Sequence, residues 1–398
     1  MQMKKIRLLQ CITLSTFGGK QIGGASIALL RLLKGLNLGR FETSLAVGNE
    51  GLLTEEAIKL GVKVYLIPEL KQTVTQGTYI LSDVLATIKI YRTIINTKCD
   101  IIHTHSSKMG FLARLAAKLA GVPVVIHTVQ GFPFYREGHW MVKKLYLLLE
   151  RLAGKWTDML ICVSRKDYDN AVANLITSAN RAVVIHNGVE LTKFNPDRTS
   201  DLRNEFGFAP NTPVIGMIAR LDPQKNPQTF VRAGAIVLKS IEEAKFICVG
   251  DGVFYPEIKQ MVDELNISKS FILTGWRQDV PELLSTLDIF VIPSIWEGFP
   301  LSILEAMAMG KPVISSDIPG SRELVMHNQT GLLAPPKNPE LLANAIIELI
   351  QDKDKAKRLA NNGQQLVKNA FDMNKIVKQH EAVYKRLYQG ICAKKGKE

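Results

Sequence analysis

The sequence has few cysteines, few aromatic residues and no long hydrophobic run. Its 398 residues include 5 cysteines, and aromatic residues make up 7% of the chain. An odd number of widely spaced cysteines, mostly inside apolar stretches, argues against a disulfide framework or a zinc site. No apolar run approaches the roughly 18 to 20 residues that a membrane-spanning helix needs, and the N-terminus merges into a strand pattern instead of a cleavage site. We therefore expect a cytoplasmic protein.

Common phosphate-binding motifs are also missing. The glycine-rich stretch 16–25 does not fit G-x-G-x-x-G, and G-x-x-x-x-G-K-[ST] does not occur, which disfavours a dehydrogenase or a P-loop NTPase. The metal-nucleotide pattern D-x-D occurs at 167–169 and 352–354. Both copies fall in helical, solvated stretches and not after a strand, so we interpret them as surface charges.

Acidic residues are scarce in the first half of the chain. Residues 1–187 contain 24 Lys and Arg against 12 Asp and Glu, whereas residues 188–398 contain 26 against 25, so nearly all of the net charge of +13 lies in the first half. Such a basic surface suits nucleic acid, anionic lipid or a phosphorylated substrate, and charge alone does not choose among them.

Short apolar runs alternate with helical patterns along the whole chain. This alternation predicts parallel sheets built from βαβ units, in two Rossmann-like halves joined near residues 188–212. We expect domains at 1–188 and 189–371, facing a shared cleft at the carboxyl ends of their strands, and a helical segment at 372–398. The predicted strands are 6–13, 43–47, 62–67, 101–105, 124–129, 214–219, 246–249, 271–273, 289–292 and 313–315.

The segment 293–312, PSIWEGFPLSILEAMAMGKP, carries the strongest functional signal. A buried strand precedes it, a loop holds Glu297, and Pro300 opens a helix that holds Glu305. A small-residue turn at a helix N-terminus presents N–H groups that suit a diphosphate, and two carboxylates are able to hold sugar hydroxyls. The alternative is a solvated Glu305 on a helix face.

A second loop supplies cations. Arg220 and Lys225 follow the strand pattern at 214–219 and precede a helix with Asn226 as its N-cap and Pro227 in its first turn. Fixed cations at a strand's carboxyl end stabilise the negative charge that develops on a departing phosphate. The alternative is a pair of surface cations near a helix start.

These two segments resemble the retaining GT-B glycosyltransferases of family 4. Their motifs are E-x7-E, with Gly298, Phe299, Pro300 and Leu301 after the first Glu, and G-x-x-x-R-L-x-x-x-K. The resemblance implies that Arg220 and Lys225 bind the donor diphosphate, that Glu297 and the 298–301 backbone bind sugar hydroxyls, and that Glu305 binds ribose. It also implies that the segment 372–398 crosses back onto the first domain.

Further donor contacts follow from the same resemblance. Gly250 follows a predicted strand, and Trp276 or Arg277 after the next strand is expected to line a uracil pocket; ordinary turn glycines are the alternative. In the first domain, Gly23 and Gly24 correspond to a glycine loop that closes against the donor diphosphate, with a plain flexible turn as the alternative.

Histidines in the first domain are the remaining candidates for the reaction centre. The segment VVIHTVQG resembles one in which relatives hold a histidine near the donor sugar, so His127 is expected to position the sugar; a structural histidine is the alternative. Close relatives read H-T-V-H-G here, whereas this chain has Gln130. His103 and His105 alternate on one strand face without a third metal ligand nearby, and strand-end packing is the commoner arrangement.

Two basic stretches point to the acceptor. Residues 105–111 resemble those of capsule, O-antigen and pilin-glycan transferases that act on polyprenyl-diphosphate sugars, which places Lys108 at the acceptor diphosphate. Residues 140–156 interleave basic and large apolar side chains between two tryptophans. This pattern suits a helix at an anionic membrane surface or, alternatively, a half-buried core helix.

The sequence therefore predicts a retaining hexosyltransferase, peripheral at the inner face of the plasma membrane. It would move a hexose or N-acetylhexosamine from a UDP-sugar to a lipid-linked glycan without a metal or other cofactor. One alternative hypothesis is that the protein is a GT-B sugar-nucleotide epimerase or sugar phosphorylase. Another is a basic nucleic-acid-binding protein, which the sequence supports only by charge, without a stacking or reading motif.

Overall fold

The computed structural model describes residues 5–16, 22–70, 80–132, 134 and 139–395. The chain divides into two compact units. Unit 1 comprises Met1–Asn187 with Met373–Glu398, and unit 2 comprises Gly188–Asp372. The chain crosses between the units twice, and within unit 2 the two crossing segments are tied by the Val189 N–H, which donates to Phe371 O at 2.9 Å.

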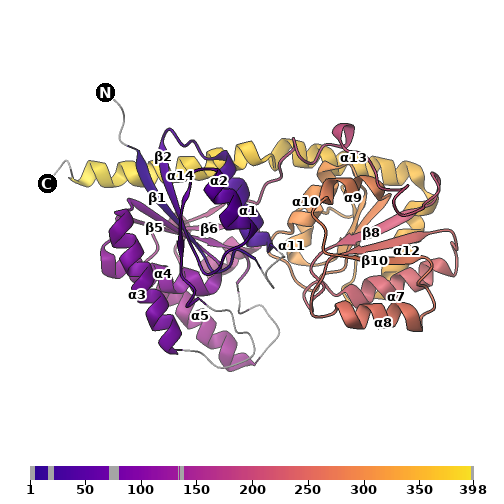
Figure 1. The fold of residues 1–398 in the computed structure, drawn as a ribbon, viewed down its shortest axis with the longest axis horizontal. Helices are drawn as coiled ribbons and strands as arrows, with labels where there is room; N and C mark the ends of the chain where they lie inside the picture. Colours follow the sequence, from indigo (N-terminus) through magenta and orange to yellow (C-terminus); the bar gives the residue numbers. More distant parts are fainter. Residues whose placement is uncertain (1–4, 17–21, 71–79, 133, 135–138, 396–398) are drawn as a thin grey trace. The chain divides into compact units, whose positions relative to one another are not determined.

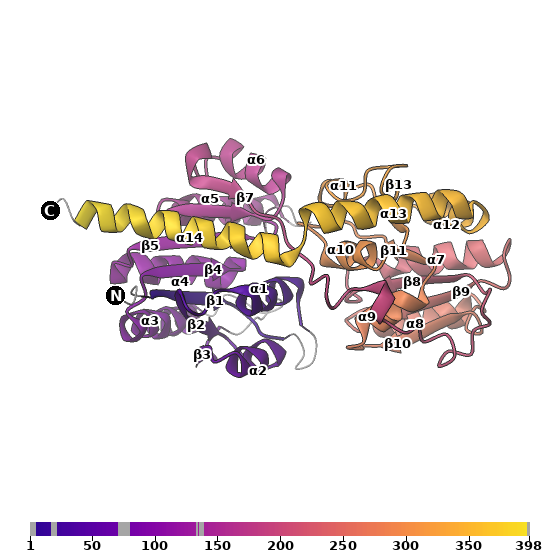
Figure 2. The same cartoon turned by 90° about the horizontal axis from the view of Figure 1, so that it is seen from above.

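Unit 1 is a parallel sheet covered by helices on both faces (Figures 1 and 2). Its strand order, β3-β2-β1-β4-β5-β6-β7, reverses between β1 and β4. The strands are β1 (Ile6–Ile12), β2 (Phe41–Val47), β3 (Lys63–Leu66), β4 (Ile101–His105), β5 (Val124–Val129), β6 (Met159–Cys162) and β7 (Ala182–Val184). The helices are α1 (Gly24–Gly35), α2 (Leu52–Lys59), α3 (Ile80–Thr97), α4 (Ser107–Ala120), α5 (Trp140–Gly154), α6 (Arg165–Ala173) and α14 (Met373–Lys395).

Unit 2 repeats this architecture with six parallel strands in the order β10-β9-β8-β11-β12-β13. The order reverses between β8 and β11, so the loops after these two strands emerge side by side. The strands are β8 (Val214–Ile218), β9 (Lys245–Val249), β10 (Phe271–Gly275), β11 (Ile289–Ile292), β12 (Val313–Ser316) and β13 (Leu332–Ala334). The helices are α7 (Pro227–Leu238), α8 (Tyr255–Glu264), α9 (Val280–Thr286), α10 (Leu301–Ala308), α11 (Pro319–Arg322), α12 (Pro339–Gln351) and α13 (Lys353–Ala370).

The predicted fold class is confirmed, and the sequence pattern missed mainly short elements. It does not predict β6, β7 or β13, which have only three or four residues, too few for a period to be recognised. The sequence pattern also predicts a helix at 111–120, whereas α4 begins four residues earlier, at Ser107.

The last helix belongs to the core of unit 1, as the resemblance implied. Met373, Ile376, Val377 and Val383 of α14 lie in one apolar cluster with residues of β1 and α1. Tyr384 of α14 is fully buried in the same cluster. The unit's sheet therefore depends on a segment that returns after the whole of unit 2 has been traversed.

A buried polar network fastens α14 to the sheet. The Tyr384 hydroxyl bonds His103 Nδ1 at 2.7 Å and accepts from Gln10 Nε2 at 3.3 Å. His105 Nε2 bonds Gln10 Oε1 at 2.9 Å, which leaves its Nδ1 buried and unpartnered among the described residues. Burial lowers the pKa of His105 to about 3 and that of His380 to about 4, so these imidazoles are neutral in the folded unit.

We expect unit 1 to lose stability in mild acid. The unfolded chain protonates histidines near pH 6.5, whereas His105 and His380 resist protonation until about pH 3 and 4. The unfolded state binds more protons in this interval, so the free energy of unfolding falls as the pH drops below about 6.5. By pH 5 the loss is about 2 kcal/mol for each such histidine.

Urea unfolding at pH 7 and pH 5 measures this effect. The variant His105→Gln should narrow the difference between the two midpoints, whereas His327→Gln, at an exposed position in unit 2, should leave it unchanged. Equal wild-type midpoints at the two pH values would contradict the expectation.

Candidate functional site

The loop after β8 presents two cations at the point where the strand order of unit 2 reverses. Asp222 organises this loop, because its carboxylate accepts from Arg220 Nε at 2.5 Å and from the Lys225 N–H at 3.1 Å. Asn226 ends the loop as the N-cap of α7, as predicted, in a left-handed conformation with φ of 50°. Its side-chain amide donates to Thr229 Oγ1 at 2.7 Å, so local hydrogen bonds compensate for the strained backbone.

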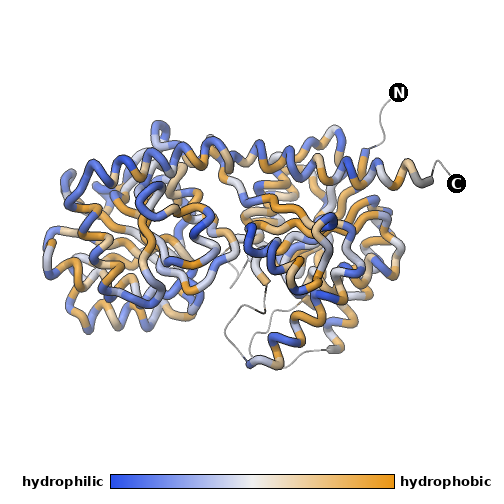
Figure 3. The backbone as a smooth tube through the Cα atoms, turned by 180° about the vertical axis from the view of Figure 1, so that it is seen from behind, coloured by the Kyte–Doolittle hydropathy of each residue, from blue (hydrophilic) through white to orange (hydrophobic). Residues whose placement is uncertain are grey.

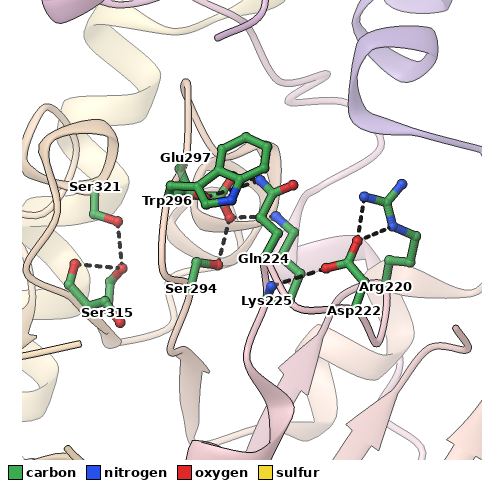
Figure 4. Close-up of polar contacts among 10 residues, drawn as sticks. Arg220, Asp222, Gln224, Lys225, Ser294, Trp296, Glu297, Ser315 and Ser321 are labelled. Carbon is green, nitrogen blue, oxygen red and sulfur yellow. Dashed lines mark hydrogen bonds and ion pairs between the residues drawn. The ribbon is translucent and has the colours of Figure 1, made fainter. Parts of the chain in front are cut away.

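The loop after β11 holds Glu297 directly against the first loop (Figure 4). Lys225 Nζ lies 2.5 Å from Glu297 Oε1, and the Ser294 hydroxyl donates to the same oxygen at 2.7 Å. Gln224 Nε2 donates to Glu297 Oε2 at 3.1 Å and to Trp296 O at 3.1 Å. The Glu297 side chain is 6% exposed. Three neighbours therefore fix both carboxylate oxygens of a nearly buried acid.

These contacts bring together three of the predicted residues and reveal three that the sequence reasoning missed. Arg220, Lys225 and Glu297 are joined through Asp222, Gln224 and Ser294. Gln224 stands within the G-x-x-x-R-L-x-x-x-K segment, at a position that the motif leaves unspecified. Its role becomes visible only when β8 and β11 are seen to be neighbours.

The helix α10 continues from this loop. Pro300 is its N-cap and contributes no side-chain hydrogen bond to the first turn. Glu305 is 9% exposed, which corrects the alternative of a solvated helix face. Phe299 is buried and packs against Phe371 with ring centroids 5.4 Å apart, whereas Gly298 is half-buried. Phe299 therefore anchors the loop by its side chain.

The expected nucleobase residues have structural partners in this unit. Gly250 has φ of 137°, and a Cβ there would lie 1.9 Å from Ala219 O, so glycine is required where β9 ends against the Arg220 loop. Arg277 forms ion pairs with Glu205, at 2.5 Å, and with Asp279. A base contact by Arg277 would compete with two carboxylates, so Trp276, which is half-buried, is the simpler candidate.

In unit 1 the predicted residues Gly23, Gly24 and Lys108 follow β1 and β4, the two strands at the corresponding reversal of strand order. Gly23 is the N-cap of α1, and Gly24 is its first residue; residues 17–21 of the predicted glycine loop lie outside the described residues. Lys108, in the first turn of α4, forms an ion pair with Asp83 at 2.7 Å. An acceptor diphosphate would have to share Lys108 with Asp83.

His127 lies near the end of β5 and is 3% exposed. Its Nδ1 bonds Thr104 Oγ1 at 2.8 Å, and its ring packs so closely on α4 that a Cβ on Gly110 would lie 2.5 Å from Cε1. Burial keeps its pKa well below the usual value. A neutral, fixed imidazole suits positioning through a hydrogen bond better than proton transfer near neutral pH.

The D-x-D interpretation requires one correction. Asp167 is not a surface charge, because it is 3% exposed and its carboxylate accepts from Ser164 Oγ at 2.9 Å at the start of α6. Asp169 pairs with Arg165 at 3.0 Å, and Asp352 is the N-cap of α13. Within the described part of the chain, no group of three or more His, Cys, Asp or Glu side chains is placed to hold a metal ion.

Comparisons with known proteins match both units. The pattern described as "Glycosyltransferase Family 4" matches residues 22–193, and "Glycosyl transferases group 1" matches residues 199–366. The chain is 35% identical over 350 residues to the UDP-Gal:alpha-D-GlcNAc-diphosphoundecaprenol alpha-1,3-galactosyltransferase of Escherichia coli, covering 87% of this chain and 89% of that protein. It is 29% identical to the N,N'-diacetylbacillosaminyl-diphospho-undecaprenol alpha-1,3-N-acetylgalactosaminyltransferase of Campylobacter jejuni, covering 92% of this chain and 98% of that protein.

A solved structure supports the same fold. Anabaena HepE, crystallised with UDP and glucose, superposes with a TM-score of 0.80 at 23% identity, covering 96% of this chain and all of that one. At this level of identity the likeness concerns the fold.

Proposed function

The chain belongs to the family 4 glycosyltransferases and is a hexosyltransferase, and we propose that it moves a hexose or N-acetylhexosamine from a UDP-sugar to a polyprenyl-diphosphate-linked glycan. The relatives from E. coli and C. jejuni, whose names specify diphosphoundecaprenol acceptors, support this proposal. The alternative hypotheses, that the protein is an epimerase, a phosphorylase or a nucleic-acid-binding protein, are not favoured.

The observation that carries the proposal is the contact between the cationic loop and the acidic loop in unit 2. Arg220 and Lys225 are held at the carboxyl end of β8, Glu297 follows the adjacent strand β11, and Lys225 touches Glu297. As the bond between sugar and diphosphate breaks, these two cations stabilise the charge that grows on the departing UDP. Glu297 and the 298–301 backbone bind the sugar hydroxyls, and Glu305 binds the ribose.

We assign the chemistry to a retaining, front-face transfer. The acceptor hydroxyl attacks the anomeric carbon on the side from which UDP leaves, and its proton passes to the departing phosphate. The bond to the acceptor forms as the bond to UDP breaks, so the reaction needs no external oxidant or base. With cations fixed at the diphosphate, we expect transfer to proceed in the presence of EDTA.

Unit 1 supplies the acceptor side in this proposal. Lys108 contacts the acceptor diphosphate, Gly23 and Gly24 approach the donor diphosphate, and His127 orients the sugar. A polyprenyl acceptor is membrane-held, so the enzyme works at the inner face of the plasma membrane as a peripheral protein. No helix among the described residues is long and apolar enough to span a bilayer.

A thermal-shift screen with nucleotide sugars tests the donor assignment. A true UDP-sugar at 100 times its Kd adds about 2.7 kcal/mol to the free energy of unfolding. For a unit of this size we expect a rise in Tm of roughly 5 °C or more. Incubation with UDP-sugar alone separates the rivals, because an epimerase converts it without an acceptor. Absence of any shift, combined with tight binding of RNA or DNA, would contradict the proposal.

A further inference from the structure

The outward side of α3 is unusually apolar for a surface helix. Its inner side is already apolar, with Ala86, Ile90 and Ile94 buried against the sheet. Six large apolar side chains of α3 nevertheless face solvent: Leu81, Val84, Leu85, Ile88, Tyr91 and Ile95. At 100° per residue they form a single stripe. A helix that is apolar on both sides is expected to be covered on both.

The outward side of α5 has the same character. Met141, Leu145, Leu148 and Leu152 recur at helical spacing and are exposed, whereas Glu150, Ala153 and Gly154 face inward. The inward side agrees with the interpretation of residues 140–156 as a half-buried core helix, and the outward side has the apolar exposure that the membrane-surface interpretation requires. In Figure 3 apolar positions recur along the helices at the lower edge of unit 1.

The two stripes belong to one layer of the unit. α4 contacts α3 on one side and α5 on the other, and the three helices lie along the same face of the sheet (Figures 1 and 2). Leu119 of α4 is 66% exposed between them. We call the exposed apolar side chains of α3, α4 and α5 the α3–α5 face.

The charges around this face are almost all positive. The sequences of α3, α4 and α5 contain eight Lys and Arg but only two acids, Asp83 and Glu150. Both acids are neutralised, Asp83 by Lys108 at 2.7 Å and Glu150 by Arg114 at 2.9 Å. The exposed basic side chains include Arg92, Lys118, Lys144 and Arg151, together with Lys89, which pairs with Glu69.

We propose that the α3–α5 face docks on the surface of an anionic lipid bilayer, with both stripes in the interfacial region and the basic side chains among the headgroups. Lipid provides an apolar layer and negative charge together, which is the complement of this face. A second copy of the chain does not fit, because a two-fold interface would place basic residues against basic residues. The inference rests on the proposed function, in which the acceptor is membrane-held, and it identifies α3 as the second helix at the membrane.

Co-sedimentation with vesicles tests the face without donor or acceptor. The full chain is mixed with vesicles of phosphatidylcholine alone or with 30% phosphatidylglycerol. We expect binding to the anionic vesicles, and a loss of at least tenfold in the partition coefficient for Leu85→Glu/Ile88→Glu and for Leu145→Glu/Leu148→Glu. The matched control, Leu38→Glu/Ile58→Glu, changes two exposed apolar residues of unit 1 outside these helices and should bind like the wild type.

Each outcome is informative. The UDP-sugar thermal shift should be the same in all variants, which shows that they are folded. The inference would be overturned if the wild type bound no vesicles, if it bound neutral and anionic vesicles equally, or if the control variant lost as much binding as the other two. It would also be overturned if the wild type were a dimer and Leu85→Glu/Ile88→Glu turned it into a monomer that binds no vesicles, because the face would then be a contact between two copies. Vesicle binding without a thermal shift by any UDP-sugar would support the membrane-docking face and contradict the proposed function. A thermal shift by a UDP-sugar without vesicle binding would support the proposed function and contradict the membrane-docking face.

Discussion

Replacing Lys225 by Ala is expected to lower kcat by roughly 100- to 1,000-fold, because removal of one fixed group that stabilises developing charge costs about 3 to 4 kcal/mol. The structure adds a second effect. Lys225 is the cation beside Glu297, whose side chain is 6% exposed, and its removal leaves a nearly buried carboxylate without a counter-charge. UDP affinity should fall as well, since Lys225 also binds the diphosphate of the product.

The measurement is steady-state transfer together with UDP binding by calorimetry. Arg220→Ala should also lower both kcat and UDP affinity, because it removes the second cation and leaves the Asp222 carboxylate without its counter-charge near the diphosphate. Lys239→Ala, just past the C-terminal end of α7 and exposed, is the matched control and should behave like the wild type. A Lys225→Ala enzyme with kcat within threefold of the wild type would remove the role assigned to this lysine.

The Glu297→Gln variant should separate turnover from nucleotide binding. Gln keeps the shape of the side chain but loses the negative charge that faces Lys225 and the sugar hydroxyls. We expect kcat to fall roughly 100-fold, in the range measured for a lost charge-stabilising group. UDP affinity should stay constant or increase, because Lys225 no longer shares its charge with a carboxylate. Full activity in Glu297→Gln would contradict the assignment.

A positioning variant completes this experiment. Gln224→Ala removes the amide that donates to Glu297 Oε2 and to Trp296 O. If Gln224 acts by holding Glu297, its loss should lower kcat about tenfold, the equivalent of one hydrogen bond of about 1.4 kcal/mol. In a Glu297→Gln background the same change should have a much smaller effect, because the two residues act as one unit. Additive losses would indicate that Gln224 acts independently.

Much of the fold was predictable because its signals are local. Buried parallel strands are short apolar runs and their helices are longer amphipathic ones, so βαβ units are recognisable from periodicity alone. The prediction was weakest at β6, β7 and β13, which have three or four residues each and owe their conformation to a neighbouring strand. Asp167 was misread for a similar reason, since its burial depends on the packing of α6.

The sequence by itself determined the family and the two Rossmann-like halves, and it indicated three site residues: the cations Arg220 and Lys225, which suit a departing diphosphate, and the carboxylate Glu297, which suits sugar hydroxyls. These follow from residue type and spacing within a single segment. Only the tertiary structure decided that Gln224 and Ser294 hold Glu297, that Tyr384 of α14 bonds His103 and Gln10 of the sheet, and that α3 and α5 share one face of exposed apolar and basic side chains. Each of these features brings together segments that are far apart in the sequence. The spacing of residues along the sequence does not encode which strands or helices become neighbours.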